Sequence, residues 1–167
     1  MNNKVKLFIT FVFVWWINIL FGAVVFNTIV LYPNFFRDVP YSLELTMEFL
    51  KARGPNNFFP PFGSAVIILN AIALFLWWKN KIIRNLLASS ILLLIIFEFL
   101  FSVLYFWELN TILFIEGRTK HSIEYLEKIS FNFQLWHWIR FCTTGIAAIL
   151  SIFTLIRIKD YDKELKF

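Results

Sequence analysis

The stretch that decides the fold is LWHWIRFCTTGIAAILSIFTLI, residues 135–156. It can cross a bilayer as a helix, because a spanning helix needs roughly 17–25 predominantly apolar residues. Yet it carries His137 and Arg140 one helical turn apart. A charged side chain at membrane depth costs about 2.5–3.5 kcal/mol on insertion scales, so such residues face a bundle interior and pair with a partner. The stretch predicts a membrane bundle with a polar interior, and Glu98 in the preceding apolar block is the candidate partner.

Three further blocks have the length and composition of spans. Residues 7–31 and 62–78 contain no Asp, Glu, Lys or Arg, and residues 85–107 contain only Glu98. Backbone groups in lipid must be hydrogen-bonded within the segment, so each block is expected to be a helix. The sequence predicts one domain, residues 1–167, folded as an all-α antiparallel four-helix transmembrane bundle. The spans are expected near residues 7–31, 62–78, 85–107 and 133–156.

The first block is expected to stay on the protein as a permanent span. Its apolar run is about twice the ~7–15 residues of a signal-peptide core, and no small-x-small cleavage pattern follows it. Orientation follows from the basic residues. With the N-terminus in the cytoplasm, the inner segments hold nine Lys or Arg against three acids, and the outer segments hold six against seven. We therefore predict a multi-pass protein of the cell membrane with both termini cytoplasmic, and we read the net charge of +5 as a topology signal with no role in nucleic-acid binding.

Two long outer loops are expected to carry short amphipathic helices. In residues 32–61 the sequence SLELTMEFLKARG places Leu43, Met47 and Leu50 on one helical stripe. In residues 108–132, Gly117 is a break and HSIEYLEKI is a second short helical segment. The alternative for this second loop is that the third span continues past residue 107 toward Glu116.

The polar residues of the spans predict a pocket in the outer half of the bundle. At about 1.5 Å of rise per residue, Asn70, Glu98, His137 and Arg140 reach one level. Helical spacing puts polar groups on one stripe in each of two spans. These stripes are Glu98, Ser102 and Tyr105, and His137, Arg140 and Thr144.

An imidazole, a guanidinium and a carboxylate in one pocket form a plausible functional site. We assign catalytic roles to His137, Arg140 and Glu98. The expected substrate-binding residues are Asn70, Ser102, Tyr105, Asn110, Trp136 and Thr144. The alternative is structural, with Glu98 and Arg140 only fixing helix register and Asn70 bonding between helices. No metal and no other cofactor is expected, because only one of the two histidines lies in a span and a Glu98–His137 pair lacks further strong ligands.

Several short motifs resemble those of a known family. They are Trp136-His137-Trp138-Ile139-Arg140, Asn110-Thr111-Ile112 upstream, Phe21-Gly22-Ala23 in the first span and Tyr32-Pro33 at its end. This ordering resembles the small four-helix integral membrane family that includes the fungal anthrone oxygenases and mostly uncharacterised bacterial members. The resemblance implies oxygenation of an aromatic or quinol-like carbon acid. In that chemistry His137 would remove a proton, Arg140 would stabilise the oxyanion and Glu98 would hold Arg140 or orient His137.

Two other functional classes stay open. The protein is alternatively a non-catalytic accessory subunit that binds a quinone or lipid head group, with the outer loops as the surface for a membrane protein partner. A small transporter is the third class, but the apolar inner halves of the third and fourth spans lack the polar path it needs. In all classes the expected partners are the lipid bilayer and a small aromatic or quinone-like molecule.

Overall fold

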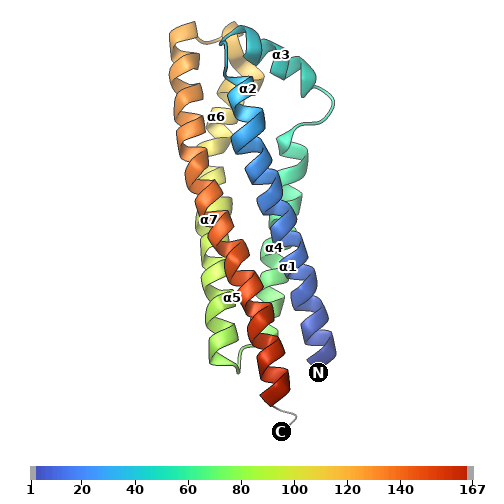
Figure 1. The fold of residues 1–167 in the computed structure, drawn as a ribbon. Coiled ribbons are helices and arrows are strands. Elements are labelled where there is room, and N and C mark those ends of the chain that lie inside the picture. The colour runs from blue at the N-terminus through green and yellow to red at the C-terminus, as the bar shows by residue number, and fades with distance from the viewer. Residues whose placement is uncertain (1–2, 165–167) are drawn as a thin grey trace.

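The computed structural model describes residues 3–164, and within them the fold is a bundle of four long helices lying side by side (Figure 1). The first helix joins α1 (Asn3–Phe26), the π-helical η1 (Asn27–Leu31) and α2 (Tyr32–Phe35). The short α3 (Tyr41–Phe49) precedes α4 (Pro55–Leu76). The fourth long helix is α7 (Ile123–Glu164). The predicted all-α bundle is confirmed.

The third helix runs over Lys81–Thr119 and changes its winding several times. Its segments are α5 (Lys81–Leu93), η2 (Leu94–Leu100), η3 (Ser102–Phe106), α6 (Trp107–Thr111), η4 (Ile112–Glu116) and η5 (Gly117–Thr119). Three of these, η2, η3 and η4, are π-helical. Short π-helical segments inside α-helices are frequent at functional sites, so this helix is where a site is expected.

All four long helices are apolar enough and long enough to cross a membrane, so the chain is a multi-pass membrane protein. The 39 residues of the third helix and the 42 of α7 correspond to roughly 58–63 Å, about twice the ~30 Å hydrocarbon core of a bilayer. Residues 3 and 164 lie at one end, called here the terminal end (Figure 1). The opposite end, called here the cap, carries α3 and the turn between the third helix and α7.

The cap has its own hydrophobic core. Its buried members are Tyr32, Phe35, Leu43, Phe106, Leu109, Ile112, Leu113, Leu126 and Phe133. The helix expected in the first loop forms as α3, which buries Leu43 and exposes Tyr41, Leu45 and Phe49. The second expected loop is instead a helical hairpin that extends the third helix and α7, so a short separate helix in residues 108–132 is wrong and the alternative of a continuing span holds. Gly117, with φ of 49°, allows the turn.

The start of α4 sets the position of its side chains along the bundle. Pro55 occupies the first turn, where a missing N–H has no cost, and the Gly54 N–H donates to the Asn57 side-chain oxygen at 3.0 Å. α4 thus begins seven residues before the apolar block 62–78. It includes Pro60 and Pro61, which remove the helical donors for two carbonyl groups of its first turns.

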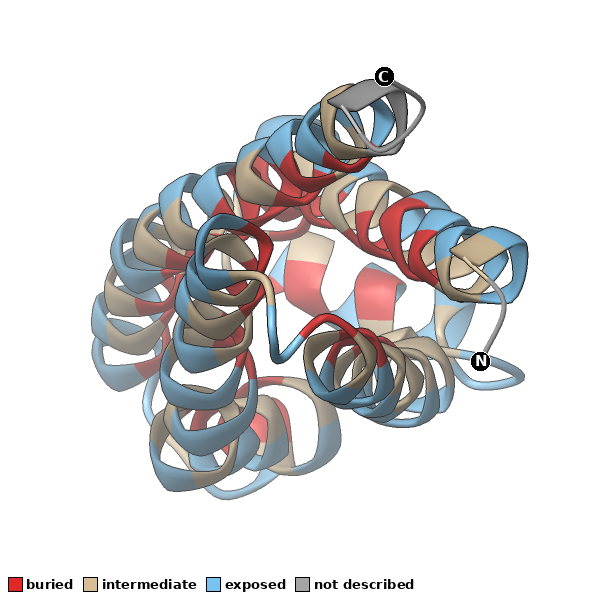
Figure 2. Cartoon of the chain, turned by 90° about the horizontal axis from the view of Figure 1, so that it is seen from below, coloured by how far each residue is buried: buried red, intermediate tan, exposed pale blue. Residues whose placement is uncertain are grey.

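The membrane part of the bundle packs around a second apolar core. Seen along the bundle axis, the buried residues lie on the faces that the helices turn toward one another (Figure 2). Polar side chains link the helices inside this core: Trp77 Nε1 donates to Thr10 Oγ1 at 3.0 Å, and Ser90 Oγ donates to the Ala147 carbonyl at 3.3 Å. These bonds hold α1 to the end of α4, and α5 to α7.

Candidate functional site

An ion pair joins the third helix to α7 inside the bundle. Arg140 Nη2 donates to Glu98 Oε2 at 2.5 Å, and Arg140 Nε donates to Glu98 Oε1 at 3.4 Å. The side chains are only 9% and 7% exposed. The pairing expected from the sequence is therefore formed, in a two-point geometry that fixes the guanidinium plane.

Thr144 completes the hydrogen bonding of the carboxylate. Its hydroxyl lies 2.5 Å from Glu98 Oε1 and 2.7 Å from the Arg140 carbonyl oxygen, so one hydroxyl hydrogen serves two acceptors. Both Glu98 oxygens thus accept hydrogen bonds, which a buried carboxylate requires. The stripe of Arg140 and Thr144 expected on α7 meets Glu98 as the helical spacing predicts.

Aromatic rings flank the guanidinium. Its central carbon lies 5.1 Å from the centre of the Phe106 ring and 5.8 Å from that of Phe59. A cation over an aromatic face is attracted by the ring quadrupole, and more strongly where water is excluded. Arg140 is held by one carboxylate and two rings, each from a different stretch of the chain.

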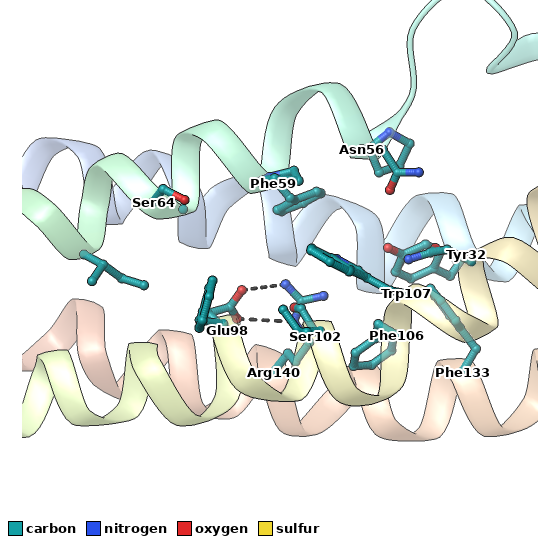
Figure 3. Close-up of a pocket in the computed structure, with 17 residues that line it drawn as sticks. Tyr32, Asn56, Phe59, Ser64, Glu98, Ser102, Phe106, Trp107, Phe133 and Arg140 are labelled. Atoms are coloured by element: carbon teal, nitrogen blue, oxygen red, sulfur yellow. Dashed lines mark hydrogen bonds and ion pairs between the residues drawn. The ribbon is translucent and has the colours of Figure 1, made fainter.

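A cavity of about 90 Å³ opens beside this pair, between α4 and the third helix (Figure 3). By the same measure a single water needs about 10–15 Å³, so the cavity has room for a small organic ring. Its lining residues come mainly from α4 and the third helix. They are Tyr32, Pro55, Asn56, Phe59, Pro60, Gly63, Ser64, Ile67, Glu98, Phe99, Ser102, Val103, Phe106, Trp107, Asn110, Phe133 and Arg140. The cavity combines aromatic walls with a charged floor.

Winding of the third helix decides which residues face the cavity. Ser102 lines it as expected, but Tyr105 does not, and Phe106 takes that place. A π-turn holds more residues than the 3.6 of an α-turn, so the face that starts at Glu98 continues at i+4 and i+8. Asn110, the next step of this series, also lines the cavity, as predicted from the sequence.

Tyr105 and Trp136 belong to a separate aromatic group. Tyr105 stacks on Phe101 with ring centres 5.4 Å apart, and its centre lies 5.8 Å from that of Trp136. Trp136 is 39% exposed, and neither residue lines the cavity. The structure therefore places these two predicted substrate-binding residues on the bundle surface beside the site.

Asn70 lies away from the cavity. With its amide oriented to suit its neighbours, Asn70 donates to the Leu87 carbonyl at 3.3 Å and accepts from the Ile91 N–H at 3.1 Å. It joins α4 to α5 near the terminal end. The reason is that α4 starts at Pro55, which puts Asn70 fifteen residues, or roughly 22 Å, into the helix.

His137 is fully buried behind the cavity wall. Its Nδ1 lies 2.8 Å from Thr28 Oγ1, and the Thr28 hydroxyl donates to the Val24 carbonyl at 2.7 Å. We therefore assign the ring proton to Nδ1, which donates to Thr28 Oγ1, and this assignment leaves Nε2 without a proton in the neutral ring. Within the described residues this buried Nε2 has no hydrogen-bond partner.

Three aromatic rings separate His137 from the cavity. The centre of its ring lies 4.5 Å from that of Tyr32, 5.7 Å from that of Phe106 and 6.1 Å from that of Phe133. All three rings line the cavity, whereas His137 does not. The structure brings His137 close to the Glu98–Arg140 site without direct access to the same space.

Sequence reasoning missed Thr28, Tyr32 and Phe59. Thr28 is one polar side chain in an uncharged span, and nothing in its spacing marks it as the partner of a residue 109 positions away. Tyr32 and Phe59 sit in what reads as loop sequence, beside Pro33 and Pro60. Proline is tolerated in the first turn of a helix, and this is the one indication in the sequence that Phe59 belongs to a span.

Neither a cluster of metal ligands among the described residues nor a matching protein assigns a role to this site. Within residues 3–164, no three His, Cys, Asp or Glu side chains gather where they could hold a metal ion. The resemblance to the anthrone-oxygenase family stays a prediction from short motifs. Comparison with protein-family models, with curated proteins and with solved structures found no match to this chain.

Proposed function

We propose that the protein binds the ring of an aromatic, quinol-like small molecule in the cavity beside Arg140. The observation that carries this proposal is the guanidinium itself, which Glu98 holds in place at the cavity wall. A guanidinium has five N–H donors, and the Glu98 pair uses two of them. The others suit a ligand oxygen of a quinone, phenol or enolate.

The walls of the cavity support an aromatic ligand. Phe59, Phe106 and Trp107 present rings to it, and aromatic pairs add about 0.5–1.5 kcal/mol beyond the area they bury. Ser102 and Asn110 add neutral polar groups on the third helix. A mostly apolar pocket with a few polar groups is the usual form of a small-molecule site.

The test is equilibrium binding of 2,3-dimethyl-1,4-naphthoquinone to purified protein in lipid nanodiscs. This quinone is fully substituted, so it does not add to the thiol of Cys142. Quenching of tryptophan fluorescence reports binding, because Trp107 lines the cavity. Trp107→Phe should remove most of the saturable quenching, and Trp15→Phe, an exposed tryptophan outside the cavity lining, should keep it.

The decisive variant removes both charges. Glu98→Leu/Arg140→Met leaves no unpaired buried charge and should weaken quinone binding about tenfold or more, the loss of one good polar contact. Asn70→Leu is the matched control, since Asn70 does not line the cavity. Absence of saturable binding in wild type, or equal binding by the double variant, would overturn the proposal.

Oxygenation of the bound ring is the second candidate function, and the unpartnered Nε2 of His137 favours it. A base takes a proton from an anthrone-type CH2, the carbanion adds O2, and loss of water leaves a ketone, so CH2 and O2 become C=O and H2O. For His137 to act on a bound ring, Tyr32 must move or a water must link the two, because Tyr32 lines the cavity and His137 does not.

Oxygen uptake with anthrone tests this candidate. Wild-type protein should consume one O2 per anthraquinone formed, faster than protein-free nanodiscs with the same anthrone. His137→Gln should lose the excess rate while still binding the quinone probe. A wild-type rate no faster than that of the protein-free discs would leave binding as the function.

The same proposal places the protein in the cell membrane with the terminal end in the cytoplasm. Support comes from the excess of Lys and Arg at that end, which orients membrane proteins. In a Cys142→Ser background, Lys79→Cys should react with a membrane-impermeant maleimide only after the cells are opened. Lys51→Cys in the cap should react on intact cells, and the reverse pattern would invert the orientation.

A further inference from the structure

We infer that the ligand is a membrane-borne molecule with a hydrocarbon tail, which enters sideways between α4 and the third helix and leaves its tail in the bilayer. This inference rests on the proposed function and names the class of ligand: a single or fused ring with oxygen substituents and an alkyl or prenyl chain. Four observations carry it.

The first is where the two helices part. α4 packs against α5 and η2, and contacts between α4 and the following segments η3 and α6 are too few to form a packed interface. The cavity fills the gap that remains, and Figure 3 looks into it with Phe59 and Ser64 on one side and Glu98 and Ser102 on the other. We infer that the ligand enters at this side of the cavity, while Asn56 and Asn110 line its polar end toward the cap.

The second observation is the level of this opening. Gly63 lies thirteen residues, or roughly 20 Å, from the terminal end of α4. That distance is within the ~30 Å hydrocarbon core of a bilayer that starts near the end of the helix. Ser64 is exposed and Phe99 is 50% exposed beside it, so the opening meets lipid chains.

Gly63 provides the third observation. A Cβ built at this position would meet no atom within 4 Å, although the residue lines the cavity. The bundle packing does not require a glycine here. Open space therefore lies beside the cavity lining at Gly63, and we infer that the chain of the ligand passes here.

The fourth observation is the distribution of charged and apolar groups around the cavity. Its volume of about 90 Å³ has room for a ring. The floor is charged and the side opening is apolar, so an amphipathic ligand has one orientation, with its oxygens at Arg140 and its chain past Gly63. A fully polar ligand would lack the apolar contact, and a plain hydrocarbon would leave Arg140 without a ligand oxygen.

The test compares two probes with the same ring in nanodiscs. One is 2-methyl-3-decyl-1,4-naphthoquinone, and the other is 2,3-dimethyl-1,4-naphthoquinone, with affinities expressed as mole fraction in the bilayer. Gly63→Phe places a ring in the passage. Gly22→Phe is the matched control, because a Cβ at Gly22 on α1 also meets nothing within 4 Å and Gly22 does not line the cavity.

Gly63→Phe should weaken binding of the decyl probe about tenfold or more and change binding of the short probe by about threefold or less. Gly22→Phe should change neither. An equal effect on both probes, or none on either, would overturn the side entry while the proposed binding function stands. Failure of both probes to bind wild-type protein would overturn the proposed function as well.

A second measurement uses wild-type protein and so does not depend on how Gly63→Phe folds. A decyl probe with a diazirine on the second carbon of the chain is photolysed in the nanodisc and the adducts are mapped by mass spectrometry. Adducts should fall on Ser64, Ile67, Phe99 or Val103 around the opening. Adducts on Asn56 and Asn110 instead would mean that the chain leaves through the polar end, against the inference.

Discussion

Arg140 Nη2 and Glu98 Oε2 lie 2.5 Å apart across the contact between α7 and the third helix, at the point where the third helix is wound as a π-helix. Both residues are about 26 Å from the terminal ends of their apolar segments, counted from Lys81 and from Arg157. The pair therefore lies near the cap-side boundary of the hydrocarbon. Its two charges cancel each other, and both residues line the cavity.

Removing one member of this pair should destabilise the protein more than removing both. Glu98→Leu leaves an uncompensated buried guanidinium, and breaking a buried pair in this way costs about 3–5 kcal/mol. Glu98→Leu/Arg140→Met should recover most of that loss. Thermal unfolding of the three proteins in the same detergent measures the difference, and a double variant as unstable as the single one would contradict a mutual pairing.

Thr28→Val should destabilise the protein through His137. Valine cannot accept the Nδ1–H hydrogen bond, and a buried polar group left unpaired costs about 1–3 kcal/mol. Thr154→Val is a matched control, because Thr154 is also buried and its hydroxyl donates to the Leu150 carbonyl of its own helix. We expect a clear drop in the unfolding temperature for the first variant and a small one for the second. Equal drops would mean that the His137 contact adds nothing.

Asn70→Leu should lower stability and leave ligand binding unchanged. The substitution removes the hydrogen bonds to Leu87, Ser90 and Ile91 of α5, each worth about 0.5–1.5 kcal/mol, and keeps the branched shape of the side chain. Unfolding temperature and quinone affinity are measured on the same preparation. A loss of affinity with unchanged stability would mean that Asn70 contributes to ligand binding, as the sequence predicts.

Gly117→Ala should destabilise the cap. The residue has φ of 49° and ψ of −144°, a conformation that costs a residue with a Cβ about 1–3 kcal/mol. Gly22→Ala, inside α1 and facing open space, should instead stabilise by about 0.5–1 kcal/mol. Comparing the two variants by thermal unfolding separates backbone strain from a general effect of replacing glycine, and a stabilised Gly117→Ala would rule out the strain.

The sequence allowed the ion pair to be predicted because charge is rare in lipid. With Glu98 and Arg140 as the charged residues of two neighbouring spans, pairing is the natural outcome, and Thr144 followed from helical spacing. Helical spacing gave the wrong prediction for Tyr105. Tertiary packing decides where a helix forms π-turns, and the amino-acid composition of the helix does not reveal them. Ser102 was found because i+4 from Glu98 lies on nearly the same face in both windings, whereas Asn110 was named only through the family-like motif.

The ends of the helices were harder to predict from the sequence. The acids at Glu108 and Glu116 read as the end of a span, yet both lie on the long helix that runs from Lys81 to Thr119. Periodicity alone does not separate a helix that ends at the lipid boundary from one that runs on into a cap. Asn70 was misplaced for the same reason, since its depth was counted from the apolar block and α4 begins seven residues earlier.

Tyr32, Phe106 and Phe133 belong both to the cap core and to the cavity lining. Whatever fills the cavity therefore tightens contacts on which the hairpin of the cap depends. By thermodynamic linkage, a ligand at one hundred times its dissociation constant stabilises the folded protein by about 2.7 kcal/mol, and part of that gain should reach Leu109, Leu113 and Leu126. Slower amide hydrogen exchange in the hairpin would then report, from the cap, that the cavity beside Arg140 is occupied.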